Sequence, residues 1–428
     1  MSVSAVVGSQ WGDEAKGKFV DLLAGEADLV ARFNGGDNAG HTVVNQYGTF
    51  KLRLMPNGLF NPKAHCVIGP GVVVNLDTLI GEIEMFRKVG VEPGERLWIS
   101  PRCNVVMPYH PLVEKINELA KGQARTGTTG RGIGPVYADK VSYNGIRMSD
   151  LAVPAQFVEK LSIQLALKNP ILQAFGLEPL IFDAVYQEKL AQFEQVRPWV
   201  KEPFGLVQEL LARQANILLE GAQGALLDNN WGTYPFCTAS ITLAGSAAAG
   251  LGIAPRWIAQ VLAVAKAYTT RVGAGPMPTE LTDEVGQTLQ REGQEYGTVT
   301  GRARRCGWFD AELVRFTCQL NGATGLALTK LDVLDTLPQV KICVGYHRPE
   351  TGDQIRHYWE GDAYWFEGCQ PVYIEMPGWK RSLRGVRQFT ELPSQAQDYV
   401  HKVEELVGVP VRYVSVGPGR DETIGLPA

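Results

Sequence analysis

A glycine-rich loop near the N-terminus has the composition and spacing of a phosphate-binding loop. It spans Gly12–Lys18 and satisfies the pattern G-x-x-x-x-G-K. Glycines let backbone N–H groups approach phosphate oxygens, while a helix N-terminus and a lysine add positive charge. The alternative is a glycine turn with surface lysines. The position after a strand and before a helix favours a nucleotide-phosphate site.

The residue after this loop departs from the usual pattern. Phe19 stands where a phosphate loop places the serine or threonine that binds Mg²⁺. Another oxygen must therefore hold the metal, and the Asp13 carboxylate inside the loop is the obvious candidate. A helix-capping role for Asp13 would not account for the missing hydroxyl.

A second glycine-rich loop, Asn34–Thr42, follows another apolar segment. The carboxyl ends of parallel strands share one edge of a sheet, so both loops are predicted at the same ligand-binding edge. A lone histidine is usually a satisfied polar residue. In such a loop, however, the His41 imidazole could donate to a group that gains negative charge.

The run Thr329–Asp332 has the form T-K-x-D and directly follows an apolar segment. A carboxylate such as that of Asp332 can accept hydrogen bonds from both N1–H and the 2-amino group of guanine, which adenine cannot offer. The Lys330 stem can cover the flat base. A four-residue motif also occurs by chance, but together with a phosphate loop it predicts GTP rather than ATP.

Three further loops carry groups that could bind substrate. Thr298–Arg305 has three arginines beside threonine hydroxyls, and guanidinium forks bind dicarboxylates or phosphates. Gly122–Pro135 contains a glycine-threonine run able to cup a phosphate. Glu220–Gly224 places the Gln223 amide where a base edge could be read. The alternative for the arginines is a solvated basic face.

The apolar segments that precede these loops predict an α/β fold with a large, mainly parallel central sheet. Several apolar segments are continuous rather than alternating, which is typical of strands buried on both faces. A helix is expected over about 17–23, and a largely helical insertion over about 100–205, where amphipathic stretches include 111–121 and 156–167. We expect a single domain over 1–428, since no linker or repeat divides the chain. The expected strands are Ala5–Val7, Leu29–Phe33, Val67–Ile68, Ile217–Leu219, Val261–Val264, Gly325–Leu328 and Val411–Val416.

Composition narrows the function classes. The net charge of −4 over 428 residues argues against general nucleic-acid binding. No apolar stretch is long enough to cross a bilayer, and Met1–Gly8 is predicted as a buried strand rather than a signal peptide. The 7 cysteines lack any C-x-x-C pair, so neither a zinc site nor a disulfide framework is indicated, and a cytoplasmic location is expected.

Together these residues resemble the adenylosuccinate synthetase family, whose members use GTP to join L-aspartate to IMP in AMP synthesis. The resemblance implies a homodimer with a shared active site, a Mg²⁺ requirement and a reaction through 6-phosphoryl-IMP. It covers nearly the whole chain and rests on Gly8–Lys18, Gly35–Thr42, Gly127–Pro135, Glu220–Asp228, Gly232–Pro235, Thr269–Pro276, Thr300–Asp310 and Thr329–Asp335.

The resemblance also implies a role for each matching residue. Asp13 would take the N1 proton of IMP, His41 would stabilise the transferring phosphoryl group with Lys16 adding positive charge, and Asp13 with the Gly40 carbonyl would hold Mg²⁺. GTP would be bound by Gly12, Glu14, Ala15, Gly17, Lys18, Gly40, Thr42, Lys330, Leu331, Asp332, Ser415 and Gly417. IMP would be bound by Asp13, Asn38, Thr129, Tyr143, Gln223, Thr238 and Arg302, and aspartate by Thr300, Arg302 and Arg304.

The chain departs from the family pattern at several site positions. Ala15 replaces a loop glycine, and Tyr143 replaces an arginine that reaches the neighbouring subunit's nucleotide. Asp37 is an unusual carboxylate beside phosphates. Ala239, Ile241, Val299 and Val416 are further departures.

These departures keep two alternatives open. One is the same ligation on another purine nucleotide such as dGMP; the retained Asp13 counts against it, because dGMP-using relatives commonly lack that residue. The other is a guanine-nucleotide-binding regulator that has lost catalysis, which the intact Asp13 and His41 oppose.

Overall fold

The computed structural model describes residues 2–297, 301–352, 354–355 and 363–427. Its centre is a nine-stranded sheet in the order β19-β18-β14-β10-β1-β9-β2-β5-β7. All neighbouring strands are parallel except β19, which is antiparallel to β18. The strands are β1 (Ser2–Gly8), β2 (Leu29–Arg32), β5 (His65–Ile68), β7 (Leu97–Ile99), β9 (Asn216–Gly224), β10 (Ile258–Lys266), β14 (Gly325–Thr329), β18 (Val411–Ser415) and β19 (Thr423–Gly425).

The predicted α/β class with a large, mainly parallel sheet is confirmed, and all seven expected strands lie in this sheet. The strands β7 and β19, which sequence patterns did not indicate, are its two edges. Each has only three residues. Such short edge strands carry too few residues to show a period, so composition does not reveal them.

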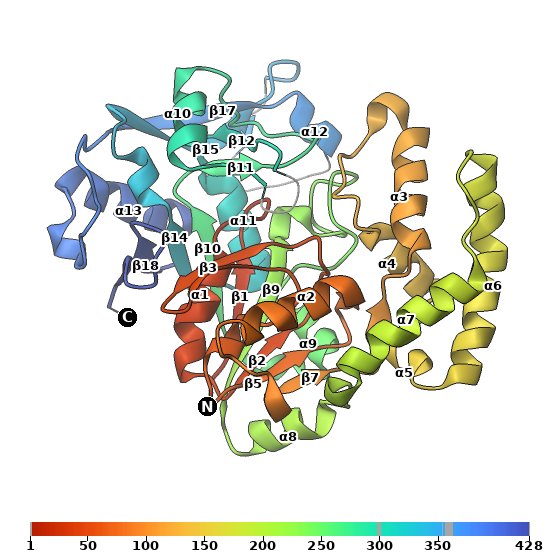
Figure 1. Ribbon diagram of the computed structural model, residues 1–428. Helices are drawn as coiled ribbons and strands as arrows, with labels where there is room; N and C mark the ends of the chain where they lie inside the picture. Colours follow the sequence, from red (N-terminus) through yellow and green to blue (C-terminus); the bar gives the residue numbers. More distant parts are fainter. Residues whose placement is uncertain (1, 298–300, 353, 356–362, 428) are drawn as a thin grey trace.

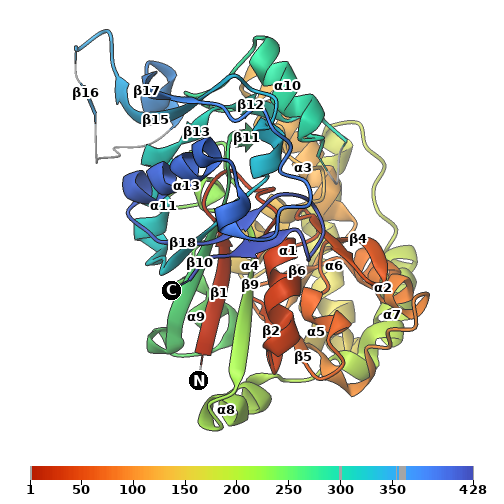
Figure 2. The ribbon, with the colours of Figure 1, turned by 90° about the vertical axis from the view of Figure 1, so that its left-hand side faces the viewer.

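Helices cover both faces of the sheet, because successive side chains of a strand point to opposite faces. Val6 of β1 packs with Phe19 and Val20 of α1 (Lys16–Leu23). Its neighbours Ala5 and Val7 face a cluster that includes α8 (Phe204–Ala212) and α9 (Ser246–Leu251). On the β10–β14 side, α13 (Ser394–Val407) and α11 (Ala311–Asn321) contribute to the core. Figures 1 and 2 show the sheet between these layers.

The segment from residue 100 to residue 205 forms a helical lobe beside the β2–β5–β7 end of the sheet (Figure 1). Its apolar side chains join the core under α2 (Leu76–Arg87). The only strand within this segment is β8 (Asn104–Val105), which pairs with β6 (Val73–Val74). The helices of the lobe are α3 (Tyr109–Ala120), α4 (Ile133–Val141), α5 (Met148–Leu151), α6 (Pro154–Ala174) and α7 (Phe182–Val196).

Smaller elements lie outside the main sheet. They comprise a second sheet, two antiparallel pairs and two helices. The second sheet contains β13 (Phe309–Asp310), β15 (Gln339–His347), β16 (Gln354–Ile355) and β17 (Gln370–Pro377). The others are β3 (His41–Asn45) with β4 (Gly48–Leu52), β11 (Thr269–Arg271) with β12 (Arg305–Gly307), α10 (Glu284–Glu292) and α12 (Ala363–Glu367). The group around α10, α12, β15 and β17 is at the top of Figure 1. Among the described residues, none of the helices combines the length and apolarity needed to span a membrane.

Candidate active site

The predicted phosphate loop connects β1 to α1, as the sequence indicated. Its backbone is strongly curved: φ is 87° at Gly12, 59° at Asp13 and 67° at Ala15. Two side-chain-bearing residues thus adopt the left-handed conformation that favours glycine. A loop curved in this way before a helix N-terminus is typical of phosphate-binding loops.

A buried carboxylate organises the inside of the loop. Glu14 accepts hydrogen bonds from the N–H groups of Gln10 at 3.1 Å and Gly12 at 2.8 Å. Its second oxygen pairs with Lys16 Nζ at 2.6 Å. Both side chains are buried. Glu14 therefore holds the loop and its first lysine in place.

The second lysine of the loop points elsewhere. Lys18 Nζ donates to Ser415 Oγ at 2.6 Å and to the Gly417 carbonyl at 2.7 Å. Burial lowers the Lys18 pKa to about 8. Phe19, at the position of the missing metal-binding hydroxyl, is fully buried in the core against the sheet. The structure thus links Lys18 to the loop after β18 and gives Phe19 a packing role.

The second glycine loop lies against the first. A Cβ at Gly17 would be only 2.9 Å from the Cβ of His41, so the start of α1 and the His41 loop are in close contact. His41 is buried, and its Nδ1 lies 2.7 Å from Glu220 Oε1. The second oxygen of Glu220 accepts the Asn57 N–H at 2.9 Å. The other ring nitrogen, Nε2, has no hydrogen-bond partner among the described residues.

The charges around His41 define its protonation chemistry. Burial lowers the pKa of His41, although the hydrogen bond to Glu220 favours the charged ring. Burial acts to raise the pKa of Glu220, but His41 and Arg32 together hold it below its ordinary value. An ionised Glu220 favours a proton on Nδ1 and leaves Nε2 as the ring nitrogen without a partner in the described part of the chain. An approaching anion would favour a proton on Nε2 as well.

Three predicted nucleotide-binding side chains meet in one hydrogen-bonded chain. Gln223 Nε2 donates to Asn38 Oδ1 at 3.0 Å, and Asn38 Nδ2 donates to Thr238 Oγ1 at 3.3 Å. The Arg302 guanidinium donates to the Gly127 carbonyl at 2.9 Å, beside the half-buried Thr129. The structure therefore places the arginine loop against the glycine-threonine loop, and Asn38, Gln223 and Thr238 next to one another.

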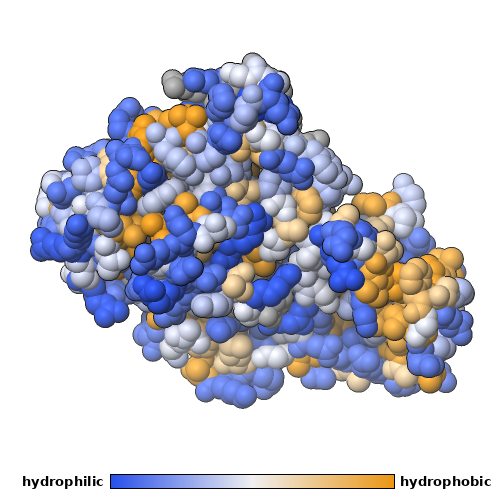
Figure 3. All heavy atoms as spheres, turned by 90° about the horizontal axis from the view of Figure 1, so that it is seen from above, coloured by the Kyte–Doolittle hydropathy of each residue, from blue (hydrophilic) through white to orange (hydrophobic). Residues whose placement is uncertain are grey.

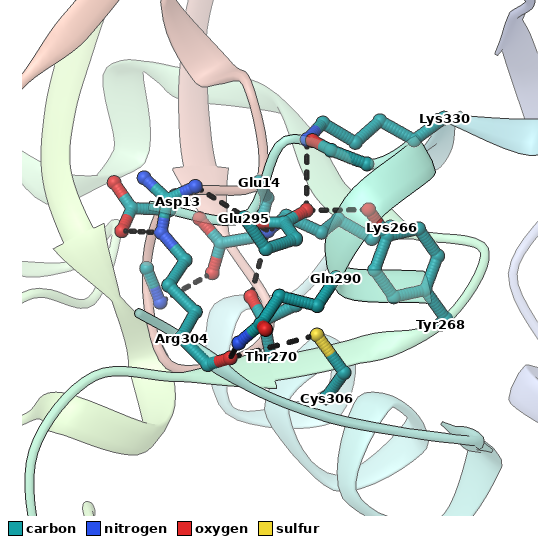
Figure 4. Close-up of polar contacts among 12 residues, drawn as sticks. Asp13, Glu14, Lys266, Tyr268, Thr270, Gln290, Glu295, Arg304, Cys306 and Lys330 are labelled. Carbon is teal, nitrogen blue, oxygen red and sulfur yellow. Dashed lines mark hydrogen bonds and ion pairs between the residues drawn. The ribbon is translucent and has the colours of Figure 1, made fainter. Parts of the chain in front are cut away.

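An ion pair connects the arginine loop to the phosphate loop. Arg304 Nε donates to Asp13 Oδ2 at 2.8 Å, and its Nη1 donates to Glu295 Oε2 at 2.6 Å. Figure 4 shows Arg304 between these two carboxylates. The Asp13 side chain is about a quarter exposed, at 26%, whereas Glu295 is fully buried. Asp13 is therefore accessible to a ligand while it is held by Arg304.

The predicted guanine-binding residues follow β14 and β18. Thr329 Oγ1 donates to the Glu14 carbonyl at 3.0 Å, which joins this end to the phosphate loop. Lys330 Nζ donates to Glu295 Oε1 at 2.7 Å and to the Gly293 carbonyl at 2.6 Å, so the position of its charge is fixed. Asp332 Oδ1 is buried and lacks a hydrogen-bond partner among the described residues. Such a buried acceptor fits the N–H pair of a guanine.

The structure also locates the departures from the family pattern. Asp37 is held at the start of α2, where its Oδ2 accepts from Asn75 Nδ2 and Thr78 Oγ1, both at 3.0 Å. The same oxygen lies 3.8 Å from Arg131 Nη1 of the glycine-threonine loop. Val416 is buried in the core, where an apolar side chain suits its surroundings. Tyr143 is 96% exposed, with φ of 67°.

Other departures fall close to the site or beyond the described part of the chain. Ala239 is half-buried and Ile241 is exposed; both follow Thr238 in the segment that contacts Asn38. Thr300 and Val299 lie outside the described residues.

Replacement of Ala15 by glycine is expected to stabilise the protein by about 0.5 kcal/mol. The left-handed conformation costs alanine about 1 kcal/mol or more, and the extra freedom of an unfolded glycine returns only part of that. Urea unfolding of both proteins measures the difference. Ala24, at φ −60° at the end of the same helix, provides the control, because Ala24→Gly should destabilise. Destabilisation by Ala15→Gly would refute a conformational cost at this position.

Comparisons with known proteins decide the family. A family model described as adenylosuccinate synthetase matches residues 5–424. The adenylosuccinate synthetase of Alkalilimnicola ehrlichii is 49% identical over 422 residues, which cover 98% of this chain and 97% of that protein. The chain belongs to the adenylosuccinate synthetase family. It is accordingly a GTP-dependent carbon–nitrogen ligase of AMP biosynthesis.

Further relatives agree with this adenylosuccinate synthetase assignment. The synthetase of Heliobacterium modesticaldum is 47% identical over 427 residues, covering 100% of this chain and 99% of that one. The fully ligated adenylosuccinate synthetase of Plasmodium falciparum superposes with a TM-score of 0.94 at 34% identity, with complete coverage of both chains. A cyanophage S-2L succinoaminodeoxyadenylate synthetase bound to dGMP and dATP shares the fold, with a TM-score of 0.63 at 19% identity, covering 100% of this chain and 96% of that one.

Two charged residues of this synthetase were not predicted from sequence. The sequence gives Glu220 no role beyond starting the Gln223 motif, and it predicts none for Glu295. Glu220 contacts a histidine 179 positions away, and Glu295 contacts Lys330, 35 positions away. Neither contact has a local sequence pattern, although the position of Glu220 at the end of an apolar strand is a usable signal.

Proposed function

We propose that the chain ligates L-aspartate to IMP, with cleavage of GTP to GDP and phosphate, through a 6-phosphoryl-IMP intermediate. The observation that carries the proposal is the ion pair between Asp13 and Arg304, at 2.8 Å. It brings the phosphate loop and the predicted aspartate-binding loop, 291 residues apart in sequence, to one point. A phosphoryl donor and a dicarboxylate acceptor can therefore meet there.

The first step transfers the γ-phosphoryl group of GTP to O6 of IMP. The O6–P bond forms as the bond between γ-phosphorus and the β,γ-bridging oxygen breaks, and the Asp13 carboxylate takes the proton from N1 of the base. His41 would meet the transferring group with Nε2, which has no hydrogen-bond partner in the described structure. Lys16, beside the loop N–H groups, would add positive charge.

The second step replaces phosphate by the aspartate amine. The amine attacks C6 of the activated base, the C6–O6 bond breaks, and inorganic phosphate leaves with the former O6 as the nitrogen gives up one proton to the departing phosphate. Phosphorylation turns a poor leaving group into a good one, so this step needs mainly orientation. Arg302 and Arg304 would hold the aspartate carboxylates through guanidinium forks. Asn38, Gln223 and Thr238 would orient IMP.

The residues present fit a magnesium ion. Asp13 offers one partly exposed carboxylate, and the Gly40 carbonyl lies in the adjoining loop. Mg²⁺ is commonly bound by one or two carboxylates together with substrate phosphates, so this sparse donor set is suitable. When bound, the ion would offset negative charge on the phosphoryl oxygens.

Competition between nucleotides tests the substrate assignment. IMP, dGMP and other purine monophosphates are offered with GTP and aspartate, and phosphate release and products are measured. We expect turnover with IMP that requires aspartate. Faster turnover of dGMP than of IMP would show that dGMP is the substrate. Binding of GTP without any aspartate-dependent phosphate release would identify a regulator. No turnover of IMP would refute the proposal.

We also propose a homodimer. Ile163, Leu167 and Ile171 of α6 are 49%, 50% and 42% exposed, and their spacing of four residues places them on one face of the helix. Figure 3 shows apolar side chains gathered over the helical lobe. Light scattering should therefore give twice the monomer mass, and a monomer at micromolar concentration would contradict the dimer.

A cytoplasmic location completes the proposal. Each of the cysteines is unpaired, and six of them are buried. Unpaired cysteines are typical of proteins kept in a reducing compartment. Fractionation of cells that express the protein would test the location.

A further inference from the structure

One buried carboxylate forms ion pairs with cations from three separate parts of the chain. Glu295 is fully buried and follows α10. It pairs with Lys266 at the end of β10 at 2.8 Å, with Lys330 after β14 at 2.7 Å, and with Arg304 at 2.6 Å. It also accepts the Tyr268 hydroxyl. Figure 4 shows these groups converging on Glu295.

The three cations have different surroundings. Lys266 is fully buried, and its Nζ also donates to Thr270 Oγ1 at 2.6 Å, so its contacts are with interior groups. Lys330 and Arg304, in contrast, belong to the loops of the candidate site, and the Lys330 Nζ also donates to the Gly293 carbonyl at 2.6 Å. Lys330 precedes Asp332 in the guanine-binding motif, and Arg304 reaches Asp13.

Glu295 is held firmly enough to serve as an anchor. Its backbone N–H donates to the Gln290 carbonyl at 2.9 Å, and its carbonyl accepts the Arg304 N–H at 2.9 Å. Although burial acts to raise the pKa of Glu295, the charges of Lys266, Lys330 and Arg304 hold it well below its ordinary value. The carboxylate therefore stays ionised.

We propose that Glu295 is a positioning residue that fixes the guanine-side lysine and the aspartate-side arginine from a single carboxylate. Its Oε1 sets Lys330 and its Oε2 sets Arg304. With Nη1 of Arg304 retained by Glu295, the Nε edge can turn from Asp13 to a substrate carboxylate, which frees Asp13. The role of Arg304 in aspartate binding rests on the proposed function, whereas the role of Lys330 rests only on GTP binding.

The test neutralises Glu295 without leaving its most buried partner unpaired. Glu295→Gln alone leaves three cations around a neutral amide and could prevent folding. The Lys266→Met/Glu295→Gln variant removes the buried pair together and is compared with Lys266→Met alone. In the single variant, Glu295 still holds Lys330 and Arg304. Far-UV circular dichroism and thermal unfolding establish that both variants are folded.

We expect the added Glu295→Gln change to raise the Kd for GDP and the KM for aspartate, each roughly tenfold, the effect of losing a charge-assisted hydrogen bond. The KM for IMP should stay within about twofold, since no IMP-side residue contacts Glu295 except through Arg304. A general structural defect would instead change all three values. Equal values in the two variants would overturn the proposal.

Glu82→Gln provides a matched control in the wild-type chain. Glu82 is another buried carboxylate, but it accepts the N–H groups of Arg53, Leu54 and Met55, remote from the arginine loop. Its neutralisation should leave the Kd for GDP and the KM for aspartate unchanged. If the wild-type protein fails to ligate IMP, the proposed function fails, while the Kd for GDP still decides whether Glu295 positions Lys330.

Discussion

Replacement of Asp13 by asparagine is expected to lower phosphate release by at least about a thousandfold, while IMP still binds. The amide has the same shape and can still accept a hydrogen bond from Arg304, which lies 2.8 Å away. It cannot take the N1 proton, and it is a weaker ligand for Mg²⁺. General-base catalysis alone contributes about a hundred- to ten-thousandfold. Single-turnover phosphate release and calorimetric IMP titration measure the two quantities.

Asp37 offers a matched control for this substitution. It lies in the adjacent glycine loop, and its carboxylate is hydrogen-bonded to Asn75 and Thr78, with Arg131 at 3.8 Å. Asp37→Asn should therefore lose far less activity than Asp13→Asn, because Asn75 and Thr78 occupy its Oδ2 and it takes no proton from the base. A fully active Asp13→Asn variant would show that another group removes the proton.

Replacement of Asp332 by asparagine is expected to change the nucleotide from GTP to XTP. A carboxylate accepts from both N1–H and the 2-amino group of guanine. An amide instead offers one acceptor and one donor, which match N1–H and the 2-oxo group of xanthine. We expect kcat/KM for GTP to fall on the order of a thousandfold, because a mismatched buried polar group is left unpaired. Steady-state rates with both nucleotides measure the change.

The pH dependence of GTP binding provides a second test of the role of Asp332. Burial raises the pKa of Asp332 to about 6 in the ligand-free protein. Only the ionised form accepts both hydrogen bonds, so the Kd for GTP should be constant above pH 6 and rise about tenfold per pH unit below it. Residual GTP binding by the Asp332→Asn variant should lack this dependence, because the amide does not titrate. An unchanged preference for GTP in that variant would remove Asp332 from the guanine site.

The sheet could be predicted from sequence because its strands are buried on both faces. The runs within β1, β10 and β14 are continuously apolar, and each precedes a glycine or polar loop. The edge strands β7 and β19 have no such pattern, since an edge position is fixed by what lies next to it in space. The helix after the phosphate loop was predicted within one residue, because the loop motif itself specifies where the helix begins.

The sequence by itself determined the local binding motifs of this protein. The Gly12–Lys18 loop and the Thr329–Asp332 motif each lie within a few consecutive residues, so their chemistry can be inferred from spacing alone. Phe19 likewise showed that a hydroxyl was missing. These features predict GTP rather than ATP, and together with the other motifs along the chain they indicate the family.

Only the tertiary structure decided which charges meet. It directs Lys18 to Ser415 rather than into the phosphate loop, bonds Asp37 to the start of α2, and brings Lys330 and Arg304 together on Glu295. The physical reason is the parallel sheet. It places β1 between β9 and β10, so loops more than 200 residues apart in sequence become neighbours at one edge, and no local pattern encodes that proximity.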